Sequence, residues 1–88
     1  MPKAIVDPEE LRRFAFDLKH FNSEVQSQVA SIHRRFVKLG ETWQDQEHAK
    51  FAESFEKMMA TLTKFVDASE KHIPFLLRKA QKAQDYLD

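Results

Sequence analysis

A single glycine, Gly40, lies near the middle of 88 residues, between two segments that share one pattern. In each segment an apolar residue recurs every three or four positions, which is the repeat of an amphipathic α-helix. No other glycine interrupts either segment, and Pro74 is the one proline that falls inside the pattern. We therefore expect an all-α fold in which two long helices form an antiparallel hairpin.

The first helix is expected over about residues 8–39. Asp7 and Pro8, followed by two glutamates, are a strong start signal: Asp caps the helix, Pro suits its first turn, and acids favour its positive end. Gly40 marks the expected end. The apolar residues between these signals are Leu11, Phe14, Leu18, Phe21, Val25, Val29, Ile32, Phe36 and Leu39.

The bend is expected over residues 40–42, within the stretch that holds both Gly40 and the single tryptophan. Glycine is the residue type that most often takes the left-handed conformation at a helix end. Thr42, with an acid three residues later at Asp45, predicts the N-cap of the second helix. Trp43 then falls in the first turn, where its ring covers the end of the core.

The second helix is expected over about residues 43–86. Proline removes one helical hydrogen bond and clashes with the preceding turn, so we expect a kink or a restart between Ser69 and Pro74. The main apolar residues of this helix are Phe51, Phe55, Met58, Leu62, Phe65, Ile73, Leu76 and Leu87.

Residues 1–88 form at most one domain, and two helices alone enclose little core. The apolar seam is also wider than one neighbouring helix covers. We therefore expect two hairpins to dimerise into a four-helix bundle, with a second copy or a paralogous hairpin as the partner. The residues assigned to this core and dimer seam are Leu11, Phe14, Leu18, Phe21, Phe51, Phe55, Leu62 and Phe65.

Two phenylalanines, Phe16 and Phe75, lie off both apolar stripes. Single exposed apolar residues are common on protein surfaces, so a half-covered position is the simpler interpretation. A contact with a partner protein is the alternative.

The charges and the polar residues exclude several function classes. Fourteen basic residues balance 14 acidic ones, so no net field favours nucleic acid or an anionic membrane. No signal peptide or membrane-spanning run is predicted, and the absence of cysteine excludes thiolate sites. Cations spaced by seven residues are expected to form a solvated face. They are Lys50, Lys57, Lys64, Lys71 and Arg78.

Two Asp-x-x-His pairs, Asp17 with His20 and Asp45 with His48, have a spacing that metal-binding helical bundles use. In a hairpin they would lie at different levels, so surface histidines are the simpler interpretation and no metal site is expected. No nucleophile–base pair and no glycine-rich phosphate loop is present. The sequence therefore predicts no catalytic residue, no cofactor and no enzyme activity.

The chain resembles the Trp-x-Gly (WXG) superfamily of small type VII (ESX) secretion proteins. The resemblance depends on Trp43 at the bend, on Phe51 and Phe55 eight and twelve residues later, and on the long helices at both sides. Two features depart from the family. Asp45 stands in the place of the glycine that names the motif, and Tyr86 is followed by two residues only, short of the Tyr-x-x-x-Asp/Glu export signature.

The resemblance implies a dimeric, non-enzymatic secretion substrate or adaptor. Such a protein is made in the cytoplasm and exported without a cleaved signal peptide, with a secretion ATPase or a larger effector as a further partner. The alternative is a cytoplasmic helical-bundle partner of a larger effector or toxin that is not exported. This alternative accounts for the incomplete export signature at Tyr86.

Overall fold

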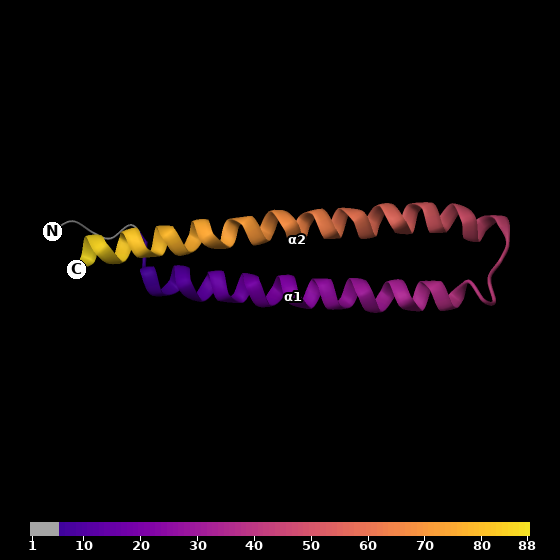
Figure 1. The fold of residues 1–88 in the computed structure, drawn as a ribbon, viewed down its shortest axis with the longest axis horizontal. Helices are drawn as coiled ribbons and strands as arrows, with labels where there is room; N and C mark the ends of the chain where they lie inside the picture. The colour runs from indigo at the N-terminus through magenta and orange to yellow at the C-terminus, as the bar shows by residue number, and fades with distance from the viewer. Residues whose placement is uncertain (1–5) are drawn as a thin grey trace.

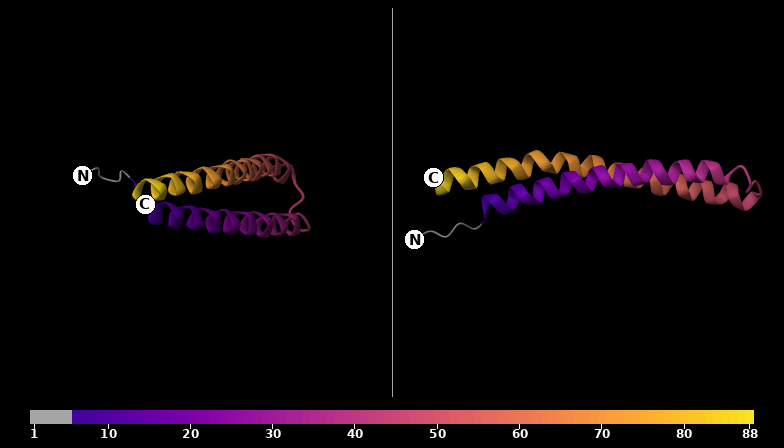
Figure 2. Two further views of the ribbon diagram at one scale, coloured as in Figure 1. Left: turned by 60° about the vertical axis from the view of Figure 1, so that its left-hand side comes forward. Right: turned by 90° about the horizontal axis from the view of Figure 1, so that it is seen from below.

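The computed structural model describes residues 6–88, which form two helices and no strand. Helices α1 (Pro8–Leu39) and α2 (Gln46–Leu87) lie antiparallel as a rod 68 Å long and 17 by 16 Å across (Figure 1). The two helices wind gently around each other, and α2 reaches beyond the start of α1 at the open end (Figure 2). The all-α hairpin that the apolar spacing predicts is confirmed.

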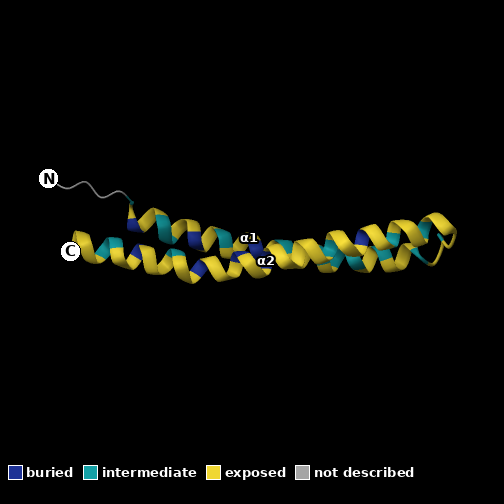
Figure 3. Cartoon of the chain, turned by 90° about the horizontal axis from the view of Figure 1, so that it is seen from above, coloured by how far each residue is buried: buried dark blue, intermediate teal, exposed yellow. Residues whose placement is uncertain are grey.

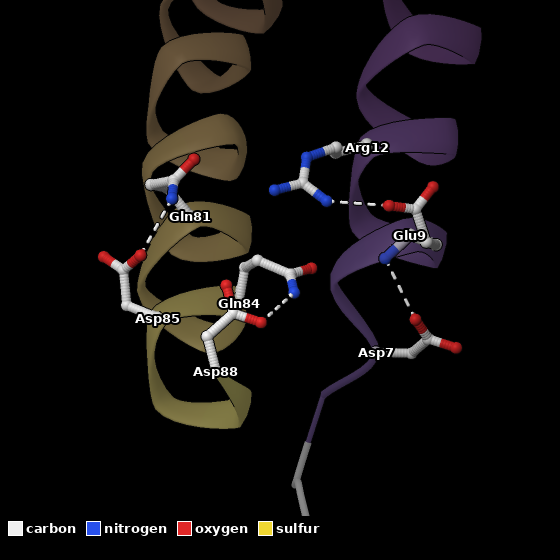
Figure 4. Close-up of polar contacts among 7 residues, drawn as sticks. All are labelled: Asp7, Glu9, Arg12, Gln81, Gln84, Asp85 and Asp88. Atoms are coloured by element: carbon white, nitrogen blue, oxygen red, sulfur yellow. Dashed lines mark hydrogen bonds and ion pairs between the residues drawn. The ribbon is translucent and has the colours of Figure 1, made fainter.

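Contacts among Asp7, Glu9 and Arg12 define the start of α1 (Figure 4). The Asp7 carboxylate accepts a hydrogen bond from the Glu9 amide at 2.9 Å, and Pro8 occupies the first turn, where its missing N–H costs nothing. Glu9 also pairs with Arg12 at 2.8 Å, one turn further on. These contacts fix the end of the helix that lies far from the bend.

Gly40 differs from the expectation, because its φ of −62° and ψ of −16° are right-handed rather than left-handed. The chain instead leaves α1 through successive turns, in which the Thr42 and Trp43 amides both donate to the Leu39 carbonyl. A Cβ at residue 40 would lie 3.2 Å from the Val37 carbonyl oxygen and 3.7 Å from Nε2 of His48. The glycine therefore serves a tight bend with the His48 ring close beside it.

The second helix begins at Gln46, three residues later than the sequence predicts, and Asp45 rather than Thr42 is its N-cap. Asp45 accepts from the His48 amide at 3.0 Å, whereas the Thr42 hydroxyl donates back to the Leu39 carbonyl at 3.4 Å. A carboxylate at the positive end of a helix is the stronger acceptor, which explains the later start. The bend consequently spans residues 40–45 and not 40–42.

Pro74 lies inside α2, which continues without a break from Gln46 to Leu87. The restart considered for residues 69–74 is absent, and α2 is one gently curved helix (Figure 2). Proline has no N–H, so the Glu70 carbonyl loses its usual helical donor. The helix keeps its course because packing against α1 continues beyond this point, with Ile73 and Ala80 both buried.

The buried core is a narrow line between the two helices (Figure 3). On α1 it follows Pro8, Ala15 and Asn22, which are seven residues apart, the repeat of paired helices that coil around each other. On α1 the large apolar residues of the predicted seam flank this line, and their contact with a dimer partner stays a prediction. On α2 the buried residues are Phe55, Val66, Ser69, Ile73 and Ala80. No helix in the described part of the chain is apolar enough over a sufficient length to cross a bilayer.

Candidate interaction surface

Most of the predicted seam is not buried within the hairpin. Phe55 is buried and Leu11 and Leu18 are half-buried, whereas the other five predicted seam residues are exposed. Exposed large apolar residues gather on one side, which we call the front face. Each of its residues is 38–55% exposed. They are Phe14, Phe21 and Ile32 of α1, with Phe51, Met58, Leu62 and Phe65 of α2.

Contacts between the helices place these residues on one face. The rings of Phe21 and Phe65 meet edge to face, with centroids 6.2 Å apart. Phe51 and Met58 precede Phe65 by two heptads and one heptad, so they continue its side of α2 toward the bend. Two open grooves run along the face. The first, about 530 Å³, is lined by Phe21, Val25, Val29, Ile32 and Leu62, with Glu24 and Gln28 as its polar lining residues. The second, about 510 Å³, is lined by Phe14, Leu18, Phe65, Ser69, His72, Phe75 and Leu76.

The two phenylalanines set apart in the sequence have different positions. Phe75 lines the second groove and so belongs to the edge of the front face. Phe16 lines neither front groove, and it follows Phe14 by two residues, which is about 200° around the helix. A broader definition of the apolar stripe on α2 would have included Phe75, and the sequence would then have predicted its place at the front face.

The bend end is a cluster of stacked aromatic rings around Phe36 and His48. These two rings are parallel within 4°, with centroids 5.2 Å apart, and Phe36 also stacks on Phe55 at 4.5 Å. Trp43 meets His48 edge to face at 5.0 Å and lies 5.9 Å from Phe51. The prediction that Trp43 covers one end of the core agrees with this position. The spacing of His48 from Asp45 indicates a possible metal ligand and gives no sign of this stacking between aromatic rings.

Polar contacts hold the Trp43 ring in place. Its indole nitrogen donates to Asp45 Oδ1 at 2.8 Å, the same atom that accepts from the His48 amide. The N-cap and the tryptophan are therefore joined through one carboxylate. Across the two helices, His33 and Glu56 lie 3.1 Å apart, with the His33 ring also stacked 6.3 Å from Phe55.

The middle of the core contains two polar residues, of which Ser69 lies on the predicted stripe of the second helix and Asn22 lies outside the predicted pattern. Asn22 is fully buried, and neither of its side-chain amide atoms has a hydrogen-bond partner. The Ser69 hydroxyl is likewise buried and without a partner. Both residues lie within one turn of the Phe21–Phe65 contact. Unpaired buried polar groups cost about 1–3 kcal/mol each, so Asn22 and Ser69 should both lower the stability of the hairpin.

The metal-ligand pairs considered in the sequence have other contacts. Asp45 serves as the N-cap and His48 is stacked between rings, while His20 lies 3.8 Å from Glu24 on the surface of α1. Within residues 6–88 no three or more histidine, aspartate or glutamate side chains converge as a metal site.

A model of one protein family, described as WXG100, "Proteins of 100 residues with WXG", matches residues 4–86. The chain belongs to the WXG100 family. No curated protein sequence matches it. Among solved structures, it is similar to the secreted protein EsxB of Bacillus anthracis, with 26% identity, full coverage of both chains and a TM-score of 0.80.

This WXG100 chain carries Trp43-Gln44-Asp45 where the family description has Trp-x-Gly. The carboxylate of Asp45 caps α2 and holds the indole of Trp43. A glycine there could accept neither hydrogen bond through a side chain. Aspartate in place of the motif's glycine therefore gives this bend two side-chain hydrogen bonds, from the Trp43 indole and from the His48 amide.

Proposed function

We propose that this WXG100 protein is a dimeric secretion substrate or adaptor of a type VII (ESX)-like system, and that it acts by contact rather than catalysis. The single observation that supports this most is the front face. Seven large apolar side chains are about half exposed on one side of a rod only 17 Å wide. Exposed patches of this kind mark protein interaction sites.

The partner that fits this face is a second helical hairpin, either another copy or a paralogue. Fully burying one such side chain is worth about 1.5–3 kcal/mol, so covering seven half-exposed ones is worth roughly 5–10 kcal/mol before entropic costs. Two hairpins stacked on their front faces form a four-helix bundle. The grooves beside Ile32 and Phe75 would then receive side chains of the partner.

The proposal that this protein is exported rests on its family membership and on its similarity to a secreted protein. WXG100 membership and the similarity to EsxB, a secreted protein, both favour export without a cleaved signal peptide. We propose that the bend, in which Asp45 holds the Trp43 ring, closes one end of the bundle. A secretion ATPase or a larger effector is the proposed further partner.

A second candidate function is a partner of a larger effector or toxin that stays in the cytoplasm. The observation that favours it is Asp45, because the residue that names the family motif is replaced and has a structural use here. The two functions differ in where the mature protein is found.

The experiment is fractionation of producing cells that carry or lack the secretion ATPase. We expect the chain in the medium only when the ATPase is present, and we expect Phe21→Glu to abolish export by preventing dimerisation. Lys64→Glu, an exposed change on the cationic face of α2, is the control and should be exported normally. Retention of the unaltered chain in both strains would reject export and favour the cytoplasmic partner.

A further inference from the structure

The large apolar side chain of α1 with the highest exposed fraction lies outside the front face. Phe16 is 72% exposed, and Val37, three heptads later, is 62% exposed. The residues one heptad apart between them are Ser23 and Ala30, both small and both exposed. We call these four residues the back stripe. A seven-residue spacing keeps them on one side of the helix.

The back stripe is separated from the front face. A groove of about 480 Å³ lies beside it, lined by Ala30, His33 and Arg34 of α1 and by Thr63 and Val66 of α2, among others. Val29 and Leu62 line both this groove and a front groove, so the two grooves lie on opposite sides of them. A second hairpin on the front face therefore leaves the back stripe uncovered.

The shape of the back stripe suits a helix. Small residues such as Ser23 and Ala30 allow a neighbouring helix to approach closely, and larger residues at both ends give it apolar contacts. The ends are about 21 residues apart, which is roughly 30 Å of helix. A partner helix of ordinary length could contact the whole stripe.

On α1, most of the charged residues around the back stripe are basic. Arg12, Arg13, Lys19, Arg34 and Lys38 lie within about 80° of it on the helical repeat. Glu9, which pairs with Arg12, is the only acid of α1 on this side. The other acids of α1, Glu10, Asp17 and Glu24, are seven residues apart and lie about 100° or more away. Within residues 6–88, no ion pair involves Arg13, Lys19 or Arg34.

We infer that the back stripe docks an amphipathic helix of another protein, with a small or apolar seam and acidic flanks. The inference rests on the proposed function only in that it assigns the front face to a second hairpin. An anionic membrane fits less well, because a flat surface over this groove would also cover Glu56 of α2, which contacts His33, whereas a helix seated along α1 would contact mainly the basic side. A second copy fits less well too, because the acids of α1 other than Glu9 lie away from this side and those of α2 alternate with lysines.

The test uses the full chain and two synthetic 21-residue helical peptides as probes. Both peptides carry the same Leu/Ala seam at heptad spacing; one has glutamate flanks and the other lysine flanks. Fluorescence anisotropy should show at least tenfold tighter binding of the acidic peptide. Phe16→Gln combined with Val37→Gln, and separately Arg34→Glu, should each weaken that binding at least tenfold.

Tyr86→Gln, which removes an exposed aromatic ring elsewhere, is the matched control and should leave binding unchanged. Equal affinity for both peptides, no binding of either, or full binding by the Phe16/Val37 double variant would overturn the inference. Capture of phosphatidylglycerol vesicles by the natural chain but not by the double variant would assign the stripe to lipid instead and overturn it equally.

A second measurement works in producing cells. A photoreactive amino acid placed at Ser23 should crosslink to an acidic helical segment of another protein, identified by mass spectrometry. Adducts to a second copy alone would overturn the inference. The mass of each sample by light scattering is recorded in parallel: a change there concerns the dimer of the proposed function, whereas loss of peptide binding at unchanged mass concerns the back stripe alone.

Discussion

Trp43 donates its indole hydrogen to Oδ1 of Asp45 at 2.8 Å, and that oxygen also accepts the amide of His48 at 3.0 Å. One carboxylate therefore orients the family's tryptophan and caps α2. The exit from α1, the aromatic cluster and the start of α2 all meet at this atom. The bend is thus more than a connection, since it closes one end of the hairpin core.

Removing that acceptor should loosen the bend. Asp45→Ala is expected to lower the free energy of unfolding by about 1–2 kcal/mol, because it deletes an N-cap and leaves the indole without its partner. Asp45→Asn keeps a side-chain oxygen and should lose less than half of that. Urea unfolding followed by circular dichroism at fixed protein concentration measures both. Equal stability of Asp45→Ala and the natural chain would contradict this role.

Replacing the buried Asn22 tests whether its unpaired polar atoms lower the stability of the core. Leucine has nearly the same shape as asparagine, so Asn22→Leu replaces two unpaired polar atoms by apolar ones without enlarging the side chain by a heavy atom. The free energy of unfolding should rise by about 1–3 kcal/mol. Gln26→Leu, at an exposed position four residues later, should change it little. A loss of stability in Asn22→Leu would show that these atoms have partners such as water.

Pro74 should lower the free energy of unfolding of the protein, because it lies inside α2. Pro74→Ala restores a helical hydrogen bond at an exposed position and is expected to raise the free energy of unfolding by up to about 3 kcal/mol. Thermal unfolding by calorimetry measures the gain. An unchanged or lower melting temperature would indicate that the protein depends on the altered helix geometry at this position.

Gly40 distinguishes two conformations of the bend. Its right-handed φ accommodates an alanine, so Gly40→Ala should change the free energy of unfolding by less than about 1 kcal/mol. A left-handed glycine would instead make the alanine variant less stable by roughly 1–2 kcal/mol. Chemical unfolding of the two proteins side by side separates these values.

The helical hairpin was predictable because the apolar spacing is continuous and the signals at Asp7, Pro8 and Gly40 agree. The details of the bend were not. Thr42 and Asp45 are both good N-caps, and only the position of the Trp43 donor and the His48 amide decides for Asp45. The conformation of Gly40 is equally open in the sequence, because glycine accepts either sign of φ.

The residues at the closest contact between the helices were not all predicted, for a related reason. Large apolar residues define a stripe in the sequence, but the stripe of this chain is wide enough for two contacts. The closer contact between helices uses the small or polar residues Ala15 and Asn22 of α1, which a search for large apolar residues does not find. The large ones, such as Phe14 and Phe21, remain outside for a partner.

The central claim is that the front face is covered by a second hairpin. Sedimentation equilibrium of the full chain at micromolar concentrations tests it most directly, together with the Phe21→Glu and Leu62→Glu variants. We predict a mass of two chains for the natural protein and dissociation or unfolding for both variants. A helical, stably folded single chain that persists at high concentration, with both variants equally stable, would contradict the account.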